Sequence, residues 1–191
     1  MNKIIINTIV FVAFCNTLNS QIVLDANIGF SLLDKYSLEI DNVDIFDESF
    51  NSINLSGYFL SIPNESENPY GFLFKVGYDL PLGSDEVLGS FNLGAGITYG
   101  SIGISRFQTP VLFNFRYTLP KEGVNTNQVA GLDLEIAPKY YLTDSQRPIF
   151  LNAFFRGGVH LGGQENTSSV GFGSHFLIGA GLGVSLSLSE Q

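Results

Sequence analysis

The chain has 191 residues, of which 45% are hydrophobic and 14% charged, with a formal net charge of −9. This length suits a single domain, and the acidity argues against nucleic-acid binding, which requires basic surfaces. After the first 20 residues no run of about 18 apolar residues occurs, so the rest of the sequence offers no membrane-spanning helix.

The first segment, residues 1–20, has the layout of a secretory signal peptide. Lys3 precedes an apolar stretch that ends at Phe14, and mostly small or polar residues follow. Cys15 is interpreted as an inert residue of this segment; the alternative, a lipid-attachment cysteine, calls for a small residue in place of Phe14. We therefore expect residues 21–191 to form the exported domain, without a disulfide bond.

Eight later segments alternate apolar and polar residues, the pattern of a β-strand with two different faces. The last is the clearest, because apolar residues occupy every second position from Phe176 to Leu188. It is longer than most strands of globular domains and suits a tilted strand that crosses a bilayer. In chain order the segments are residues 22–31, 53–62, 70–80, 91–99, 106–117, 132–140, 149–160 and 175–188.

Polar connections separate these segments. Eight strands joined in this way predict an all-β fold, a closed antiparallel up-and-down transmembrane β-barrel. Pro110 and Pro138 fall inside strands, where each should mark a bulge or a weak pairing because proline lacks the N–H of the ladder. The expected connections are residues 34–52, 63–69, 83–90, 100–105, 120–128, 143–147 and 162–172.

Periodicity alone does not decide whether the apolar face meets lipid or the core of a soluble, lipocalin-like barrel. Three observations favour lipid. The polar faces are rich in glycine, which suits a narrow interior. The polar faces carry four acids and five bases, whereas the rest of the predicted domain carries 14 acids and three bases. Finally, five tyrosines lie on the apolar faces near strand ends, where an interfacial girdle belongs: Tyr70, Tyr78, Tyr99, Tyr117 and Tyr140.

Near-neutral polar faces predict a paired charge network inside the barrel, since an unpaired buried charge costs several kcal/mol. Counting along the hairpins places Arg116 opposite Asp133, and Arg156 opposite Glu135. We expect this network to hold the barrel shut, and an ion pathway is the alternative. Its members are Asp25, Lys75, Asp79, Arg106, Arg116, Asp133, Glu135, Lys139 and Arg156.

Two segments resemble a known family. Residues 107–117, Phe-Gln-Thr-Pro-Val-Leu-Phe-Asn-Phe-Arg-Tyr, place a proline before an apolar run that ends in an aromatic residue, and residues 176–188 alternate glycine with apolar residues. Both are similar to strands of the bacterial outer-membrane β-barrel domain family, which includes PorT-like proteins and, more distantly, the OmpA/OmpX-type eight-stranded barrels. Many such barrels end in an aromatic residue that the insertion machinery reads, whereas residues 189–191 here are Ser-Glu-Gln. The resemblance implies no single activity.

The sequence offers few candidates for chemistry. His160 and His175 should lie nearly opposite each other and face inward, as a possible ligand pair with Glu165 nearby. Two imidazoles alone make a poor zinc site, so polar filling of the interior is preferred and no metal or cofactor is expected. Ser174 and His175 are neighbours on a strand and point to opposite faces, so they form no catalytic dyad. The acidic connection 34–52 could gather calcium or form a contact patch, but it lacks the glycine-centred spacing of an EF-hand.

The preferred hypothesis is therefore a non-enzymatic outer-membrane barrel that displays loops, supports the envelope or binds a partner. Its expected partners are membrane lipid, lipopolysaccharide and the insertion machinery, with no nucleic acid. A narrow channel for small or apolar solutes and a lipid-modifying enzyme are the alternatives. The connections 34–52, 83–90, 120–128 and 162–172 should face outward.

Overall fold

The computed structural model describes residues 20–63, 70–99, 106–124, 126, 128–142, 148–164 and 168–187. The predicted signal peptide, apart from Ser20, lies outside these residues, and so does Glu165. No helix in the described part of the chain is long and apolar enough to cross a membrane. The strands are β1 (Ser20–Ile40), β2 (Val43–Pro63), β3 (Tyr70–Leu82), β4 (Val87–Tyr99), β5 (Phe107–Pro120), β6 (Gln128–Ile136), β7 (Lys139–Tyr141), β8 (Ile149–Gly163) and β9 (Val170–Ser187).

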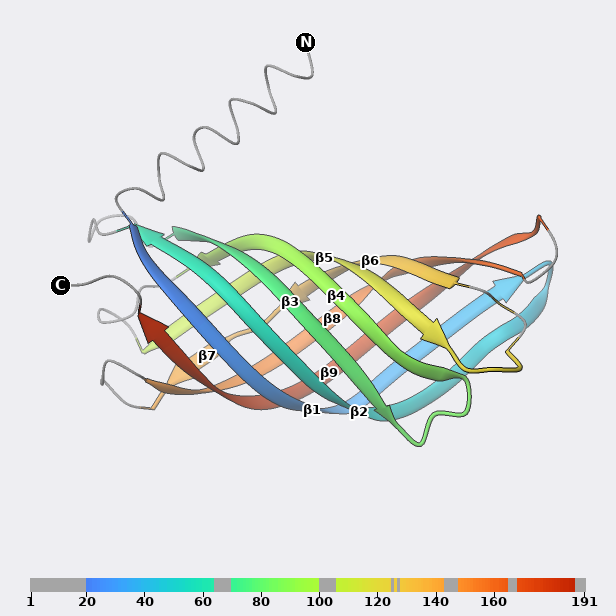
Figure 1. The fold of residues 1–191 in the computed structure, drawn as a ribbon, viewed down its shortest axis with the longest axis horizontal. Coiled ribbons are helices and arrows are strands. Elements are labelled where there is room, and N and C mark those ends of the chain that lie inside the picture. Colours follow the sequence, from blue (N-terminus) through green and yellow to red (C-terminus); the bar gives the residue numbers. More distant parts are fainter. Residues whose placement is uncertain are drawn as a thin grey trace, which may run out of the picture.

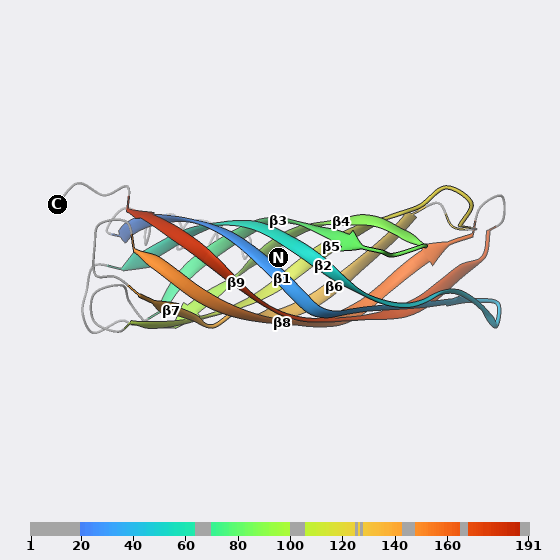
Figure 2. The same cartoon turned by 90° about the horizontal axis from the view of Figure 1, so that it is seen from below.

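The strands form one closed antiparallel barrel (Figures 1 and 2). Each strand pairs with its neighbours around the ring, β4 with β5 and β1 with β9 included, and β7 continues β6 after a short break. The predicted eight-stranded barrel is therefore confirmed. Following the paired residues once around the ring from Ile28 leads back to β1 at Glu39. This stagger tilts the strands, as barrel closure requires.

The apolar faces of the strands point outward. On β3, Phe74 and Val76 are 60% and 63% exposed, whereas Lys75 and Asp79 are 2% and 1% exposed. The other strands repeat this arrangement, so the apolar side chains ring a cylinder whose interior holds the buried charged and polar residues together with smaller apolar clusters. The alternative of a soluble barrel with an apolar core is therefore wrong.

Aromatic residues gather at two levels of the outer surface. Near one end, the rings of Tyr70 and Tyr99 lie 5.4 Å apart on adjacent strands, and Phe107 pairs with Tyr140. Eight residues farther along β3, Tyr78 packs on Phe91, with ring centroids 4.8 Å apart. A strand rises about 3.3 Å per residue and tilts by about 40°, so the two levels are about 20 Å apart in depth. This separation suits the apolar band of an outer-membrane barrel.

The connection expected at residues 34–52 is instead a strand hairpin. β1 continues to Ile40 and β2 begins at Val43, joined by Asp41 and Asn42, whose φ values of 52° and 62° are those of a tight hairpin turn. In Figure 1 this hairpin, like β8–β9, reaches farther than the β3–β4 hairpin at the same end. The prediction of a loop failed because the alternation shifts by one residue at Leu32, as described below.

Two other connections are shorter than expected. β4 begins at Val87, and the connection between β8 and β9 is shortened at both ends because β8 ends at Gly163 and β9 begins at Val170. The prediction for Pro138 is confirmed: the ladder breaks at Ala137–Pro138, between β6 and β7. Pro110 lies within β5 directly beside this break, where its carbonyl accepts a hydrogen bond from the Ala137 N–H at 3.0 Å. The two prolines thus lie side by side at the break between β6 and β7.

Inward-facing glycines on β9 make room for large side chains from β8. The ring of Phe154 covers Gly179, and that of Phe150 covers Gly183. A Cβ atom at Gly179 would lie 2.3 Å from the Phe154 ring and 2.6 Å from the Phe30 carbonyl oxygen. The narrow interior therefore requires glycine here, as the glycine-rich polar face predicts.

Replacing Gly179 by alanine should destabilise the barrel by about 1–3 kcal/mol, because the added methyl overpacks against backbone as well as side chain. Gly57→Ala is the matched control, since a Cβ there meets only the Asp25 carbonyl oxygen at 3.8 Å. Urea unfolding in lipid vesicles measures both variants. Equal stability of the two would contradict this packing of the interior.

Candidate functional site

A network of buried charges fills the middle of the barrel. Eight of the nine predicted residues lie there, on the inward faces of β1, β3, β5, β6, β7 and β8, and none is more than 3% exposed. They are Asp25, Lys75, Asp79, Arg116, Asp133, Glu135, Lys139 and Arg156.

Glu135 on β6 is the most connected member. Its carboxylate pairs with Lys75 Nζ at 2.6 Å and with Arg156 Nε at 2.8 Å. It also accepts hydrogen bonds from Asn114 at 3.1 Å and from the Tyr58 hydroxyl at 3.3 Å. One carboxylate thus joins side chains from β2, β3, β5 and β8 across the lumen.

The neighbouring pairs extend this cluster in both directions. Arg156 also binds Asp79, which accepts hydrogen bonds from the amides of Asn54 and Asn92. Arg116 Nε binds Asp133 at 2.8 Å. The expected contacts of Arg116 with Asp133 and of Arg156 with Glu135 are both present. Arg156 and Glu135 are register partners, as predicted, whereas Arg116 lies opposite Gly131, two residues from the predicted Asp133.

A separate pair lies toward the end where β1 begins. Lys139 binds Asp25, which also accepts a hydrogen bond from Ser185. The Lys139 ammonium lies 4.0 Å from the centre of the Tyr58 ring, close enough for a cation–π interaction. Through Tyr58, this pair connects to Glu135.

Arg106 does not belong to the network, contrary to the prediction. It precedes β5, which begins at Phe107, and its side chain is exposed. The alternation of faces holds only within a strand, so it does not direct a residue beyond the strand end. Arg106 lies at the rim of the barrel.

Asp34 is a buried acid that the sequence analysis placed in a solvated loop. Leu32 and Leu33 both face outward, because a β-bulge separates Ser31 from Asp34 in the pairing of β1 with β2. The bulge shifts the alternation by one residue, so Asp34 and then Tyr36 point inward. In the sequence, the signal for this shift is a pair of consecutive leucines, Leu32 and Leu33, within an otherwise alternating strand.

The two histidines do not form a shared ligand site. His160 Nδ1 lies 3.1 Å from Arg116 Nη2, and its Nε2 lies 2.7 Å from the Ser37 carbonyl oxygen. His175 instead contacts Asp34 and Asp133. No group of three or more potential metal-ligating side chains occurs among the described residues.

The contacts of His175 do not form a catalytic triad. The Ser52 hydroxyl donates to Asp34 Oδ2 at 2.9 Å, and His175 binds the other oxygen of the same carboxylate. The serine therefore contacts the acid rather than the imidazole, so no base is in place to activate it.

An apolar cluster lies across the lumen directly beside the charge network. It combines residues from the β1–β2 hairpin with residues from β4 and β6: Tyr36, Leu38, Ile40, Phe46, Phe50, Val87 and Val129. Tyr36 connects the two regions, because its ring lies 4.8 Å from the Arg116 guanidinium and 4.6 Å from the His175 ring, and its hydroxyl bonds Ser90 at 2.8 Å. This end of the interior is thus packed with side chains.

The connections beyond this cluster are linked to one another by hydrogen bonds. Glu48 on β2 binds the Ser84 hydroxyl at 2.5 Å and the Asp85 N–H at 2.6 Å. Lys121, which follows β5, donates to the Ser84 carbonyl oxygen at 2.5 Å. Burial and the nearby Glu48 carboxylate raise the pKa of Glu86. The described residues at this end of the barrel therefore form a hydrogen-bonded, acidic surface.

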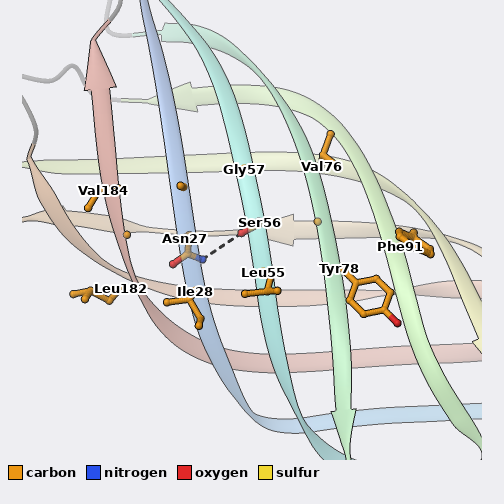
Figure 3. Close-up of a pocket in the computed structure, with 13 residues that line it drawn as sticks. Asn27, Ile28, Leu55, Ser56, Gly57, Val76, Tyr78, Phe91, Leu182 and Val184 are labelled. Carbon is orange, nitrogen blue, oxygen red and sulfur yellow. Dashed lines mark hydrogen bonds between the residues drawn. The ribbon is translucent and has the colours of Figure 1, made fainter.

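A groove of about 670 Å³ lies on the outer wall over β9, β1, β2, β3 and β4 (Figure 3). Ala26 and Gly57, which pair with each other, leave it shallow and wide. Its walls include Ile28, Leu55 and Phe91, and none of the described residues that line it is charged. This is a hollow in the lipid-facing surface, unlike a catalytic pocket, which combines apolar walls with convergent polar groups.

No protein-family model matches the chain, and no curated protein matches its sequence. Solved structures share its fold, among them two with a TM-score of 0.50 each. The outer membrane protein OprG from Pseudomonas aeruginosa is 11% identical, and the match covers 87% of this chain and 96% of that one. Neisserial surface protein A (NspA) is 12% identical, with 87% and 97% covered. The predicted resemblance to eight-stranded outer-membrane barrels is confirmed for the fold, and the PorT-like resemblance stays a prediction.

Replacing Glu135 by glutamine should destabilise the barrel by about 3–5 kcal/mol, because it leaves Lys75 and Arg156 with one carboxylate fewer in a buried site. Glu122→Gln is the control, since Glu122 is exposed in the connection after β5. Urea unfolding in vesicles reports the difference. A Glu135 variant as stable as the control would show that the network does not hold the barrel together.

Proposed function

We propose that this chain is a non-enzymatic outer-membrane protein whose barrel is a closed scaffold and whose projecting end carries the function. The observation that carries this proposal is the filled interior: paired charges occupy the middle, and the apolar cluster around Tyr36 covers them at one end. An eight-stranded barrel has room for side chains and little else. The outward apolar band and the fold shared with OprG and NspA support placement in the outer membrane.

The proposed orientation puts the ends of the β1–β2 and β8–β9 hairpins outside the cell. Outer-membrane barrels have short periplasmic turns and longer extracellular connections, and these two hairpins extend beyond the others (Figure 1). The tip at Asp41–Asn42 and the neighbouring Asp44, Asp47 and Glu48 make this end acidic. Display of this surface to a partner or to the envelope is the function that we propose.

The proposed partners follow from the two surfaces of the barrel. The apolar band contacts membrane lipid and, in the outer leaflet, lipopolysaccharide, and the closed fold requires the outer-membrane insertion machinery for assembly. The acidic end repels nucleic acid.

The first experiment tests both the location of the protein in the outer membrane and the closure of its lumen. Membrane fractionation should recover the protein with the outer membrane, and the band should move on a gel after boiling, since a folded barrel and its unfolded chain migrate differently. A peptide tag inserted between Asp41 and Asn42 should be labelled on intact cells. In planar bilayers the purified protein should produce no steady conductance, and a stable conductance would favour the channel alternative.

The lipid-facing assignment predicts a contrast between two arginine variants. Ile136→Arg should destabilise the barrel by about 2–4 kcal/mol, because Ile136 faces outward within the apolar band. Val43→Arg should change stability little, since Val43 is 59% exposed at the hairpin tip. Urea unfolding in vesicles distinguishes the two. If the Ile136 variant were unchanged, the band would not lie in lipid.

A further inference from the structure

The projecting ends of four adjacent strands present one outward face that is acidic on one side and apolar on the other. β2, β1, β9 and β8 are neighbours in that order, and the β1–β2 and β8–β9 hairpins reach farthest at this end (Figure 1). We call this surface the amphipathic face. One row of register partners crosses it from β2 to β8, and all four are exposed: Asp44, Glu39, Phe172 and Leu161.

The apolar side of the amphipathic face lies beyond the lipid-facing band. Phe172 and Val170 on β9 are 74% and 60% exposed, and Leu161 on β8 is 46% exposed. Leu151 pairs with Tyr140, which belongs to the first aromatic level, and Leu161 lies ten residues farther along β8. That distance is about 25 Å in depth, whereas the two aromatic levels are about 20 Å apart. Apolar side chains that gather outside the band are typical of an interaction surface.

The acidic side of the amphipathic face carries charge that the chain does not neutralise. Glu39 lies directly opposite Asp44, and Asp47 lies on the same side of β2. Among the described residues, no lysine or arginine forms an ion pair with any of these three acids. Lys35 is four residues from Glu39, about 13 Å along β1. Like charges opposite each other destabilise a sheet, so a cation supplied by a partner would relieve this repulsion.

The two sides of the face form one continuous surface. The hydroxyls of Ser37 on β1 and Ser174 on β9 lie 2.9 Å apart and join the acidic strand to the apolar one. Both side chains are short, so nothing large separates the acids from Phe172. Four strands about 4.8 Å apart span about 14 Å, which is enough for one helix of about 10–12 Å in diameter.

We propose that the amphipathic face binds a polypeptide segment with basic residues along one side and apolar residues along the other. This inference rests on the proposed function, because it names the class of partner for the displayed end. The charge of the face argues against two other occupants. Lipopolysaccharide is anionic, and a second copy of this chain has a net charge of −9, so both would bring negative charge toward Glu39 and Asp44.

The test measures binding of a synthetic helical peptide to the full chain in nanodiscs of zwitterionic phospholipid. The fluorescently labelled peptide has lysines on one side and leucines on the other, and anisotropy with empty nanodiscs is subtracted. The double variant Glu39→Gln with Asp44→Asn should bind it about fivefold to tenfold more weakly, because two exposed ion pairs are lost. Phe172→Ser should weaken binding by about tenfold, since aromatic residues contribute most at interfaces.

Two matched variants control for general loss of charge or apolar surface. Glu122→Gln removes an exposed acid from the connection after β5, and Leu88→Ser removes a side chain that is 54% exposed on β4. Both lie outside the amphipathic face, so both variants should bind like the wild type. All five substituted side chains are exposed, and the shift of the band after boiling checks that each variant is folded.

The peptide itself supplies further controls. Added salt should weaken binding by screening the ion pairs, and a peptide with glutamates in place of the lysines should not bind. Binding that is unchanged in the double variant or in Phe172→Ser would overturn the proposal, as would equal binding to empty nanodiscs. If the tag at Asp41–Asn42 were labelled on cells but the peptide did not bind, this partner class would be wrong while the display function stood. If the peptide bound but the tag were not labelled, the display function would fail instead.

Discussion

The structure depends on one constraint: a closed sheet in hydrocarbon must turn its apolar residues outward, so each charge on a spanning strand has to find a partner inside. The strands meet this constraint by pairing their charges inside the lumen, where the single carboxylate of Glu135 binds two cations. Glycines such as Gly179 follow from the same constraint, because a narrow cylinder must fit large side chains against its own backbone. The composition of the strands, their alternation and the pairing of their charges thus all follow from the hydrocarbon that surrounds the barrel.

The β-bulge at Leu32–Leu33 lets one strand serve two environments. Before it, β1 turns apolar residues toward lipid; after it, Tyr36, Leu38 and Ile40 point inward and cover the charge network. Without the shift these apolar side chains would face water beyond the membrane, and Asp34 would face outward. A single extra residue therefore turns the apolar side chains of β1 from the lipid-facing surface to the interior, where they close one end of the lumen.

Much of this could be predicted from the sequence, because alternation within a strand has a period of two and hairpin pairing links neighbours. The contact of Arg156 with Glu135 follows from that counting alone, whereas the counting is two residues off for Arg116, which lies opposite Gly131 and reaches Asp133 diagonally. The errors lie where the period breaks: Arg106 is beyond a strand end, and Asp34 follows a bulge. The placement of Tyr36 against Arg116 and His175 could not be predicted, since it depends on the curvature that brings nonadjacent strands across one lumen.

The distribution of charge separates a paired interior from an exposed acidic surface. Inside, every acid of the network contacts a cation. At the projecting end the balance is acidic, yet Glu48 and Lys121 tie the hairpin and two connections together through Ser84 and Asp85. Ordered connections lose less conformational entropy on binding than mobile ones, which favours recognition. Under the proposed function, a partner approaching from outside would therefore meet one acidic surface, whose base the pairing of β1 with β9 joins to the barrel wall.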